Sequence, residues 1–328
     1  MLFSTSLSHA QGDITRIDVQ ARMDWQDQWK QSTLKSDDSG FRGKYLVARM
    51  DGRYGDHLTY SIRQRFNRAH ADESYFNSTD WANITWAFND RFSISGGKQV
   101  VAVGGFEYDR APIDLYQCSE YWNNIACYQF GVSAAWKLSK SDNLSLQICQ
   151  SPNRAAVKDM YAVNFMWNGS HGPWSAIWTL NAIESKPGDF IGYIALGNKF
   201  TAGITSLELD LMSRPMFSEF DPVDDISVMA ELAVRPSERL NIFTKYSYDK
   251  NGSNNLDFCV LPDTEVHRIG GGMEYFPVRD SRILRLHAQV SYADGTNTNP
   301  YGVLGPKQFL LDMGVTLNLD VLKAIRKH

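Results

Sequence analysis

The sequence predicts an all-β fold, a transmembrane antiparallel β-barrel of about sixteen strands. Three observations predict it. Most of the chain divides into segments of about ten residues in which apolar and polar side chains alternate, the period of a strand with two different faces. The connectors between these segments alternate between short turns and longer loops, the layout of an outer-membrane barrel. No run of about 18 apolar residues is present that could form a membrane-spanning helix.

Composition and charge narrow the class of protein further. Hydrophobic residues make up 43% of the chain, and the formal net charge is −4. Proteins that bind nucleic acids are usually basic, so no nucleic-acid partner is expected. A length of 328 residues alone would suggest two domains, whereas the alternation favours a single barrel domain over residues 12–328. Residues 1–11, which include the small-x-small pattern Ser8-His9-Ala10, are expected to be a residual signal peptide or a disordered leader.

Five predicted strands precede the longest connector. In the first of them, Ile17, Val19, Ala21 and Met23 share one face and charged or amide side chains occupy the other. Short turns join the second strand to the third and the fourth to the fifth. These strands span residues 16–26, 44–54, 58–67, 80–88 and 92–98.

Eleven further strands follow the longest connector. The segment 190–199 is the least regular because it does not separate two faces, and the last segment is the most regular. Aromatic side chains cluster where strands meet short turns, which fits an interfacial girdle formed by Tyr54, Phe88, Phe92, Trp136, Trp167 and Trp174. The predicted strands span residues 128–137, 143–150, 158–167, 174–184, 190–199, 201–213, 225–235, 239–248, 266–276, 282–292 and 309–321.

The connector 99–126 is the candidate functional segment. Long connectors without secondary structure of their own are uncommon and usually functional. This one carries five aromatic side chains, too much apolar surface for a solvated linker, together with a mixed set of charges. We therefore expect this third long loop to fold into the lumen of the barrel and narrow it. Its charged residues are Glu107, Asp109, Arg110, Asp114 and Glu120.

Arginines on the first three strands are candidates for the wall that faces this loop. The alternation sends them to the polar face, and the short turn at 55–57 places Arg49 opposite Arg63. Like charges at opposed positions destabilise a strand pair, so they need counter-charges or a function. The functional interpretation is a cationic wall that attracts anions and faces the acidic residues of the loop. The alternative is a solvated face neutralised by Asp18, Asp24 and Asp51. The wall arginines are Arg22, Arg49, Arg53, Arg63 and Arg65.

The cysteines and histidines form no recognisable metal, cofactor or catalytic motif. The four cysteines lack CxxC spacing, and Cys118 and Cys127 either pair in an oxidising periplasm or remain free thiols. His267 and His287 lie on neighbouring predicted strands, but no G-x-S-x-G motif accompanies them. An outer-membrane hydrolase is therefore the weaker alternative. A soluble propeller would show a blade repeat, and none is seen.

Three short motifs resemble a known family. Gly97-Lys98-Gln99, the stretch 104–107 and Asp114-Leu115-Tyr116 are similar to the strand and third loop of the phosphate-selective porin (O/P porin) superfamily of Gram-negative outer membranes. The resemblance implies a sixteen-stranded, homotrimeric outer-membrane porin, surrounded by lipid, through which small hydrophilic or anionic solutes diffuse. It implies an anion preference and no cofactor. A full ladder of loop arginines is not found, so phosphate specificity does not follow from the resemblance.

Overall fold

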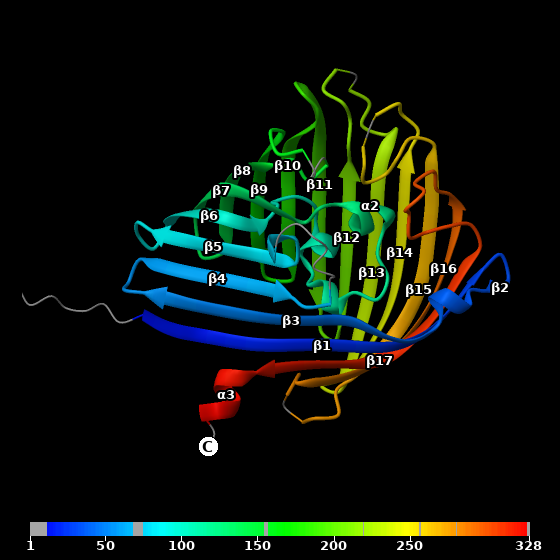
Figure 1. Cartoon of the computed structure of the whole chain (residues 1–328), viewed down its shortest axis with the longest axis horizontal. Coiled ribbons are helices and arrows are strands. Elements are labelled where there is room, and N and C mark those ends of the chain that lie inside the picture. Colours follow the sequence, from blue (N-terminus) through cyan, green and yellow to red (C-terminus); the bar gives the residue numbers. More distant parts are fainter. Residues whose placement is uncertain are drawn as a thin grey trace, which may run out of the picture.

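The computed structural model describes residues 12–67, 75–153, 157–218, 220–255, 257–279 and 281–326. Seventeen strands form one antiparallel sheet, and because β2 has only two residues, sixteen long strands remain, as the sequence predicts. Figure 1 shows them curving into a barrel. The strands are β1 (Gly12–Lys30), β2 (Thr33–Leu34), β3 (Gly40–Tyr54), β4 (Leu58–Arg65), β5 (Thr79–Ala87), β6 (Phe92–Val100), β7 (Tyr128–Lys137), β8 (Asp142–Gln150), β9 (Tyr161–His171), β10 (Trp174–Lys186), β11 (Asp189–Ala202), β12 (Thr205–Ser213), β13 (Asp225–Ser237), β14 (Leu240–Asn251), β15 (Thr264–Tyr275), β16 (Leu284–Thr296) and β17 (Gln308–Asp320).

The barrel closes where the first strand pairs with the last. β1 pairs with β17 from Asp18↔Asp320 to Lys30↔Gln308, and its other edge pairs with β3. Every other long strand pairs with its sequence neighbours, so no long strand keeps an open edge that could template aggregation. The pairing of β3 with β4 places Arg49 opposite Arg63, which confirms the register predicted from the turn.

The distribution of side chains is the reverse of that in a water-soluble protein. Apolar residues at the predicted outward positions, such as Met23, Ile84 and Leu180, are exposed, whereas inward polar residues such as Asp24 and Asn164 are buried. A barrel in lipid keeps an apolar outer face and a polar interior. The outer faces of the strands are therefore suited to a bilayer. Among the residues described, no helix has the length and apolar character needed to cross a membrane.

Aromatic rings gather near the short turns. Phe92 stacks between Phe88, with ring centroids 5.4 Å apart, and Trp136, at 4.6 Å. Further along, Trp167 lies 6.0 Å from Trp174. These contacts join residues of the expected girdle, and such rings sit at the interface between the apolar core and the headgroups.

Several boundaries differ from the sequence-based expectation. β1 runs from Gly12 to Lys30 and β3 begins at Gly40, so the expected long loop 27–43 is largely extended strand. The last strand ends at Asp320, and Val321 begins helix α3 (Val321–Arg326) instead of ending the strand. The segment 190–199, which lacked alternation, is nevertheless part of strand β11. Other groups approach Gly192 and Gly197 closely, which accounts for the absence of side chains at these two positions of the pattern. The predicted leader 1–11 lies outside the described residues.

Candidate functional site

The segment 101–127 between β6 and β7 contains two short helices, α1 (Phe106–Asp109) and α2 (Glu120–Asn124). The first backbone N–H groups of a helix have no partner within the helix. Here carboxylates of the barrel wall accept from them. Asp210 of β12 accepts from the amides of Phe106, at 3.0 Å, and Glu107, at 2.8 Å. Asp249 of β14 accepts from the amide of Glu120 at 2.7 Å. The wall therefore holds the start of both helices.

Ion pairs join the same segment to β12, β13 and β14. Arg110 donates to both carboxylate oxygens of Glu231 at 2.8 Å and also pairs with Glu208. Although burial alone would lower it, the carboxylates of Glu231 and Glu208 raise the pKa of Arg110. Lys245 is almost fully buried and lies 2.7 Å from a carboxylate oxygen of Glu107. Removing one partner of a buried ion pair strongly destabilises the folded chain, because a buried charge is left uncompensated. These contacts therefore fix the position of the segment.

Two arginines from the seam of the barrel hold the middle of the segment. Arg22 of β1 donates to the carbonyl of Leu115 at 2.6 Å, and Arg285 of β16 donates to Asp114 at 2.6 Å. The guanidinium carbons of Arg22 and Arg285 lie 4.5 and 5.6 Å from the ring centroid of Tyr116. The ring of Tyr116 thus contacts two guanidinium groups, which the electron distribution of the ring favours.

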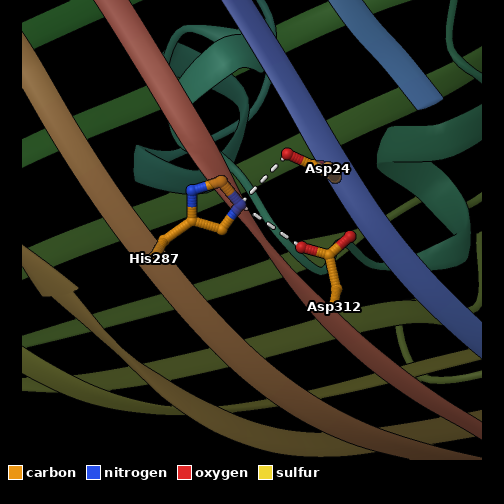
Figure 2. Close-up of side chains that lie close together, drawn as sticks. All are labelled: Asp24, His287 and Asp312. Atoms are coloured by element: carbon orange, nitrogen blue, oxygen red, sulfur yellow. Dashed lines mark ion pairs between the residues drawn. The ribbon is translucent and has the colours of Figure 1, made fainter. Parts of the chain in front are cut away.

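A buried histidine lies beside this contact. Figure 2 shows His287 of β16 with its Nε2 atom between Asp24 of β1, at 3.1 Å, and Asp312 of β17, at 3.4 Å. Among the described residues, this is the group whose nitrogen and carboxylate atoms are close enough to surround one metal ion. Arg22 lies 2.7 Å from Asp24 and 3.5 Å from Asp312, so a guanidinium already supplies positive charge to both carboxylates. Arg22 therefore joins β1 to β17 by charge pairing, and the Nε2 atom of His287 brings β16 to the same two carboxylates. Gly314 leaves room for it, since a Cβ there would meet Asp24 at 2.4 Å.

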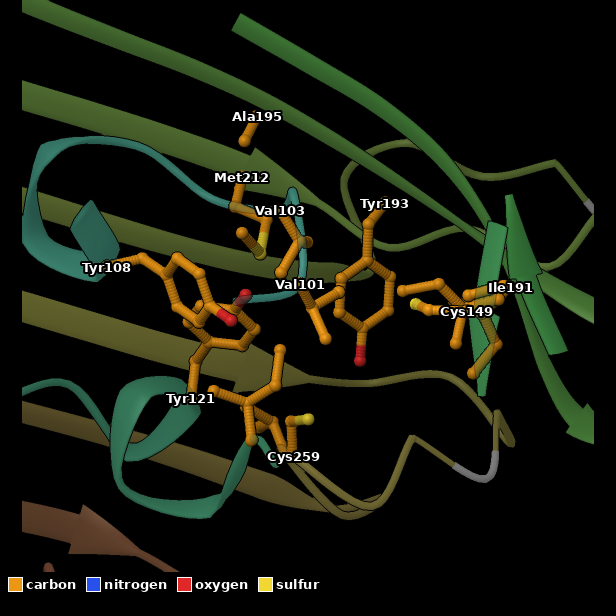
Figure 3. Packing of buried hydrophobic residues seen from close by; sticks show 14 of the residues in the cluster. Val101, Val103, Tyr108, Tyr121, Cys149, Ile191, Tyr193, Ala195, Met212 and Cys259 are labelled. Atoms are coloured by element: carbon orange, nitrogen blue, oxygen red, sulfur yellow. The ribbon is translucent and has the colours of Figure 1, made fainter. Parts of the chain in front are cut away.

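Apolar packing holds the other half of the segment. Figure 3 shows Val101, Val103, Tyr108 and Tyr121 in a buried cluster with wall residues such as Tyr193. Burial raises the pKa of Tyr108 and of Tyr121 well above the usual tyrosine range. The aromatic side chains that make this connector unusual for a linker are thus packed against the barrel wall.

The wall arginines of the first strands carry their own counter-charges. Arg49 lies 2.9 Å from Asp51, and Arg63 and Arg65 lie 3.4 and 3.0 Å from Asp80. Arg53 pairs with Asp13 at 3.1 Å near a short turn. Asp51 is one of the neutralising residues that the alternative interpretation names, as is Asp24, which pairs with Arg22. These contacts favour the neutralised wall over an uncompensated cationic one.

Among the described residues, no ion pair joins an acidic residue of the segment to Arg22, Arg49 or Arg63. Glu107 pairs with Lys245 and Asp114 with Arg285, on strands β14 and β16. Glu120 accepts from the backbone amide of Leu304 at 3.2 Å. Burial, followed by the charge of Glu208, raises the pKa of Asp109. Of the three arginines, Arg22 alone has a hydrogen bond to the segment among the described residues, and it binds a backbone carbonyl.

The cysteines and histidines can now be placed. Cys118 and Cys127 are free thiols in the structure, so the pairing left open by the sequence is not formed. Burial raises the pKa of Cys118 to about 12 and that of Cys127 to about 11, which makes both thiols unreactive. His267 is exposed on the outer face, where it stacks on a tyrosine, whereas His287 is buried on the inner face. The two histidines considered for catalysis therefore point to opposite sides of the sheet.

Sequence reasoning missed the residues that hold the segment on β12 to β16. Their signal was present but weak. Each is a charged residue at an inward position of an otherwise regular strand. A charged residue that merely faces the lumen would give the same pattern, so the pattern does not single these residues out. The missed residues are Glu208, Asp210, Glu231, Lys245, Asp249 and Arg285.

Comparison with known proteins agrees with the barrel. Residues 16–173 match the model of the family described as phosphate-selective porin O and P, a range that contains the three motifs singled out in the sequence. No curated protein shows a significant sequence match.

Solved structures resemble the whole chain. The anion-selective porin from Comamonas acidovorans has a TM-score of 0.68 at 12% identity, covering 94% of this chain and 100% of that chain. OmpT of Vibrio cholerae gives 0.65 at 12% identity, with 94% and 98% covered. The channel DcaP of Acinetobacter baumannii gives 0.64 at 14% identity, with 95% and 99% covered. At these identities the likeness shows the fold alone.

Proposed function

We infer that this outer-membrane channel protein, whose residues 16–173 match the phosphate-selective porin family model, passes small hydrophilic anions through a barrel narrowed by the segment 101–127. The observation that carries the proposal is the attachment of this segment. It contacts β12, β13 and β14 through Arg110 and Glu107, and β1 and β16 through Leu115 and Asp114. A segment bound to inward side chains on both sides of the seam lies across the lumen rather than at its rim.

The constriction we propose is formed by the segment and the cations that bind it. Arg22, Lys245 and Arg285 reach the segment from the wall, and Arg110 reaches the wall from the segment. Rings of charged side chains in a narrow passage set which ions enter. Because every one of these cations also contacts a carboxylate, the narrowest part carries mixed charge, and its main effect is on the size of the solute.

We also propose that the chain assembles as a homotrimer. The support comes from a similar barrel, OmpT of Vibrio cholerae, whose structure is described as a trimer form and which matches with a TM-score of 0.64. The outer face of β1 to β6 offers exposed apolar side chains, among them Met23, Ile62 and Ile84, against which lipid or a second copy can pack. Cross-linking of the protein in outer-membrane vesicles, followed by mass analysis, tests the trimer separately from the channel.

Planar-bilayer recording tests the channel. Purified protein, checked by heat-modifiable migration, should give stepwise conductance in KCl and a reversal potential on the anion side in a salt gradient. Deleting residues 106–120 removes both the helix α1 and the contacts of Arg110 and Asp114, so conductance should rise. A barrel that folds but gives no steps would contradict the channel. Steps of unchanged size in the deletion variant would instead contradict the constriction.

A further inference from the structure

A cavity of about 660 Å³ lies between the segment 101–127 and the end of the barrel that carries the short turns. Ile113 and Asp114 form its inner end. Gly203 and Ile204, in the turn between β11 and β12, lie at its outer end, together with Arg282 just before β16. Binding sites for small molecules commonly measure about 300–1,000 Å³, so this space can hold an organic solute.

The charges that line this cavity do not cancel. Five cationic side chains and four carboxylates line it among the described residues. All four carboxylates are engaged. Glu208 and Glu231 pair with Arg110, while Asp114 and Glu274 pair with Arg285.

Two of the cations are not paired with any carboxylate of the described residues. Arg235 at the end of β13 and Arg282 before β16 form no ion pair with any described residue. Both are exposed and both line the cavity. Burial, followed by the positive charge of Arg235, lowers the pKa of Arg282, as expected for a cation that shares this space with a second one. Two like charges that share one space are stabilised by an anion between them.

An apolar surface adjoins these arginines. The guanidinium carbon of Arg282 lies 3.9 Å from the ring centroid of Phe276, which is buried and also lines the cavity. Ile204 and Ala233 add further apolar surface. A site that pairs guanidinium groups with a ring and aliphatic side chains favours a solute that is charged at one end and apolar at the other.

We propose that this cavity binds organic oxyanions, solutes that carry a carboxylate or phosphate group beside an apolar ring or chain. Arg235 and Arg282 hold the oxyanion, since a guanidinium can donate two parallel hydrogen bonds to it. Phe276 and Ile204 contact the apolar part. The proposal rests on the channel function above and deepens it, because it places solute recognition at the short-turn end and away from Arg22, Arg49 and Arg63, whose charges are matched by aspartates.

Block of the KCl current by two probes with one headgroup tests this site. Phenylphosphate and inorganic phosphate are added in turn to each side of a bilayer that holds the full chain. Phenylphosphate should halve the current at a concentration roughly tenfold lower than inorganic phosphate, and at lower concentration from the short-turn side. The double variant Arg235→Gln, Arg282→Gln should raise the half-blocking concentration of phenylphosphate by at least about tenfold, because charge-assisted contacts are lost.

Arg91→Gln is the matched control. Arg91 is an exposed arginine in the short turn between β5 and β6 that does not line the cavity, and the current through its variant should be blocked as in the unchanged protein. The charge-reversing Arg282→Glu variant gives a second check, since this side chain is exposed, and it should weaken the block by phenylphosphate at least as much as the double variant does. Equal block by the two probes, or unchanged block in the double variant, would overturn the site while channel steps persist. Loss of all steps would instead count against the channel function.

Discussion

Replacing Lys245 with methionine should free the segment 101–127 from β14. In the folded chain the Nζ atom of Lys245 lies 2.7 Å from Glu107 and 3.0 Å from the carbonyl of Gln117, and the side chain is 3% exposed. Removing one partner of a buried ion pair costs ~3–5 kcal/mol because a charge is left uncompensated. The hydrogen bonds from Ser119 to Glu107 remain, so we expect the lower end, ~3 kcal/mol. The open population of the segment should then rise about 100-fold.

The thiol of Cys118 reports on this opening. It follows Gln117 directly and is buried, and burial raises its pKa to about 12, so it should react with a maleimide at pH 8 mainly when the segment detaches. Peptide mass analysis measures the labelling of Cys118 with time in the folded, detergent-solubilised barrel. The control is Lys250→Met, which removes a half-exposed pair 3.6 Å from Asp224 and should cost ~0–1 kcal/mol. Equal labelling rates in the two variants would refute the assignment of Lys245 as an anchor.

Three further outcomes are expected. Val315→Arg places a charge on the outer face of β17 near its middle and should lower the free energy of unfolding of the barrel, measured by urea titration, by ~2–4 kcal/mol. Val315→Leu should be nearly neutral, and equal effects of the two variants would contradict the register. In the unfolded, unreduced protein, all four thiols should react with a thiol reagent, including Cys118 and Cys127. Failure of these two alone to react would mean that they form a disulfide. Arg49→Gln alone should shift the reversal potential toward cation selectivity, more at low salt than at high salt. Adding Asp51→Asn should restore the reversal potential, because the two charges form a pair at 2.9 Å. A shift that persists in the double variant would mean that the wall is not neutral.

The strands and their register could be predicted because each position depends on local alternation. The opposition of Arg49 and Arg63 follows from a three-residue turn and two alternating segments, and the structure has it. The residues at which strands begin and end were harder to predict from the sequence. β1 extends to Lys30 because pairing with β17 continues there, and no local pattern in residues 27–30 announces a partner that is distant in the sequence.

The position of the segment 101–127 is a different problem, because its contacts are long-range and chemically interchangeable. The sequence gives acidic residues on the loop and arginines on the first strands, and pairing them is the simplest hypothesis. The structure pairs Glu107 with Lys245 instead, across 138 positions of sequence, while Arg49 is satisfied by Asp51, two residues away. An arginine with an aspartate at i+2 has its counter-charge on the same face of the same strand.

This local pairing is visible in the sequence and could have guided the prediction. Arg22 with Asp24 and Arg49 with Asp51 repeat the i, i+2 spacing, and both ion pairs form in the structure. Arg63 and Arg65 have no acidic residue two positions away, and they pair with Asp80 of the adjacent strand instead. Pairing within one strand could therefore have been predicted from the spacing alone, whereas pairing across strands requires the register as well.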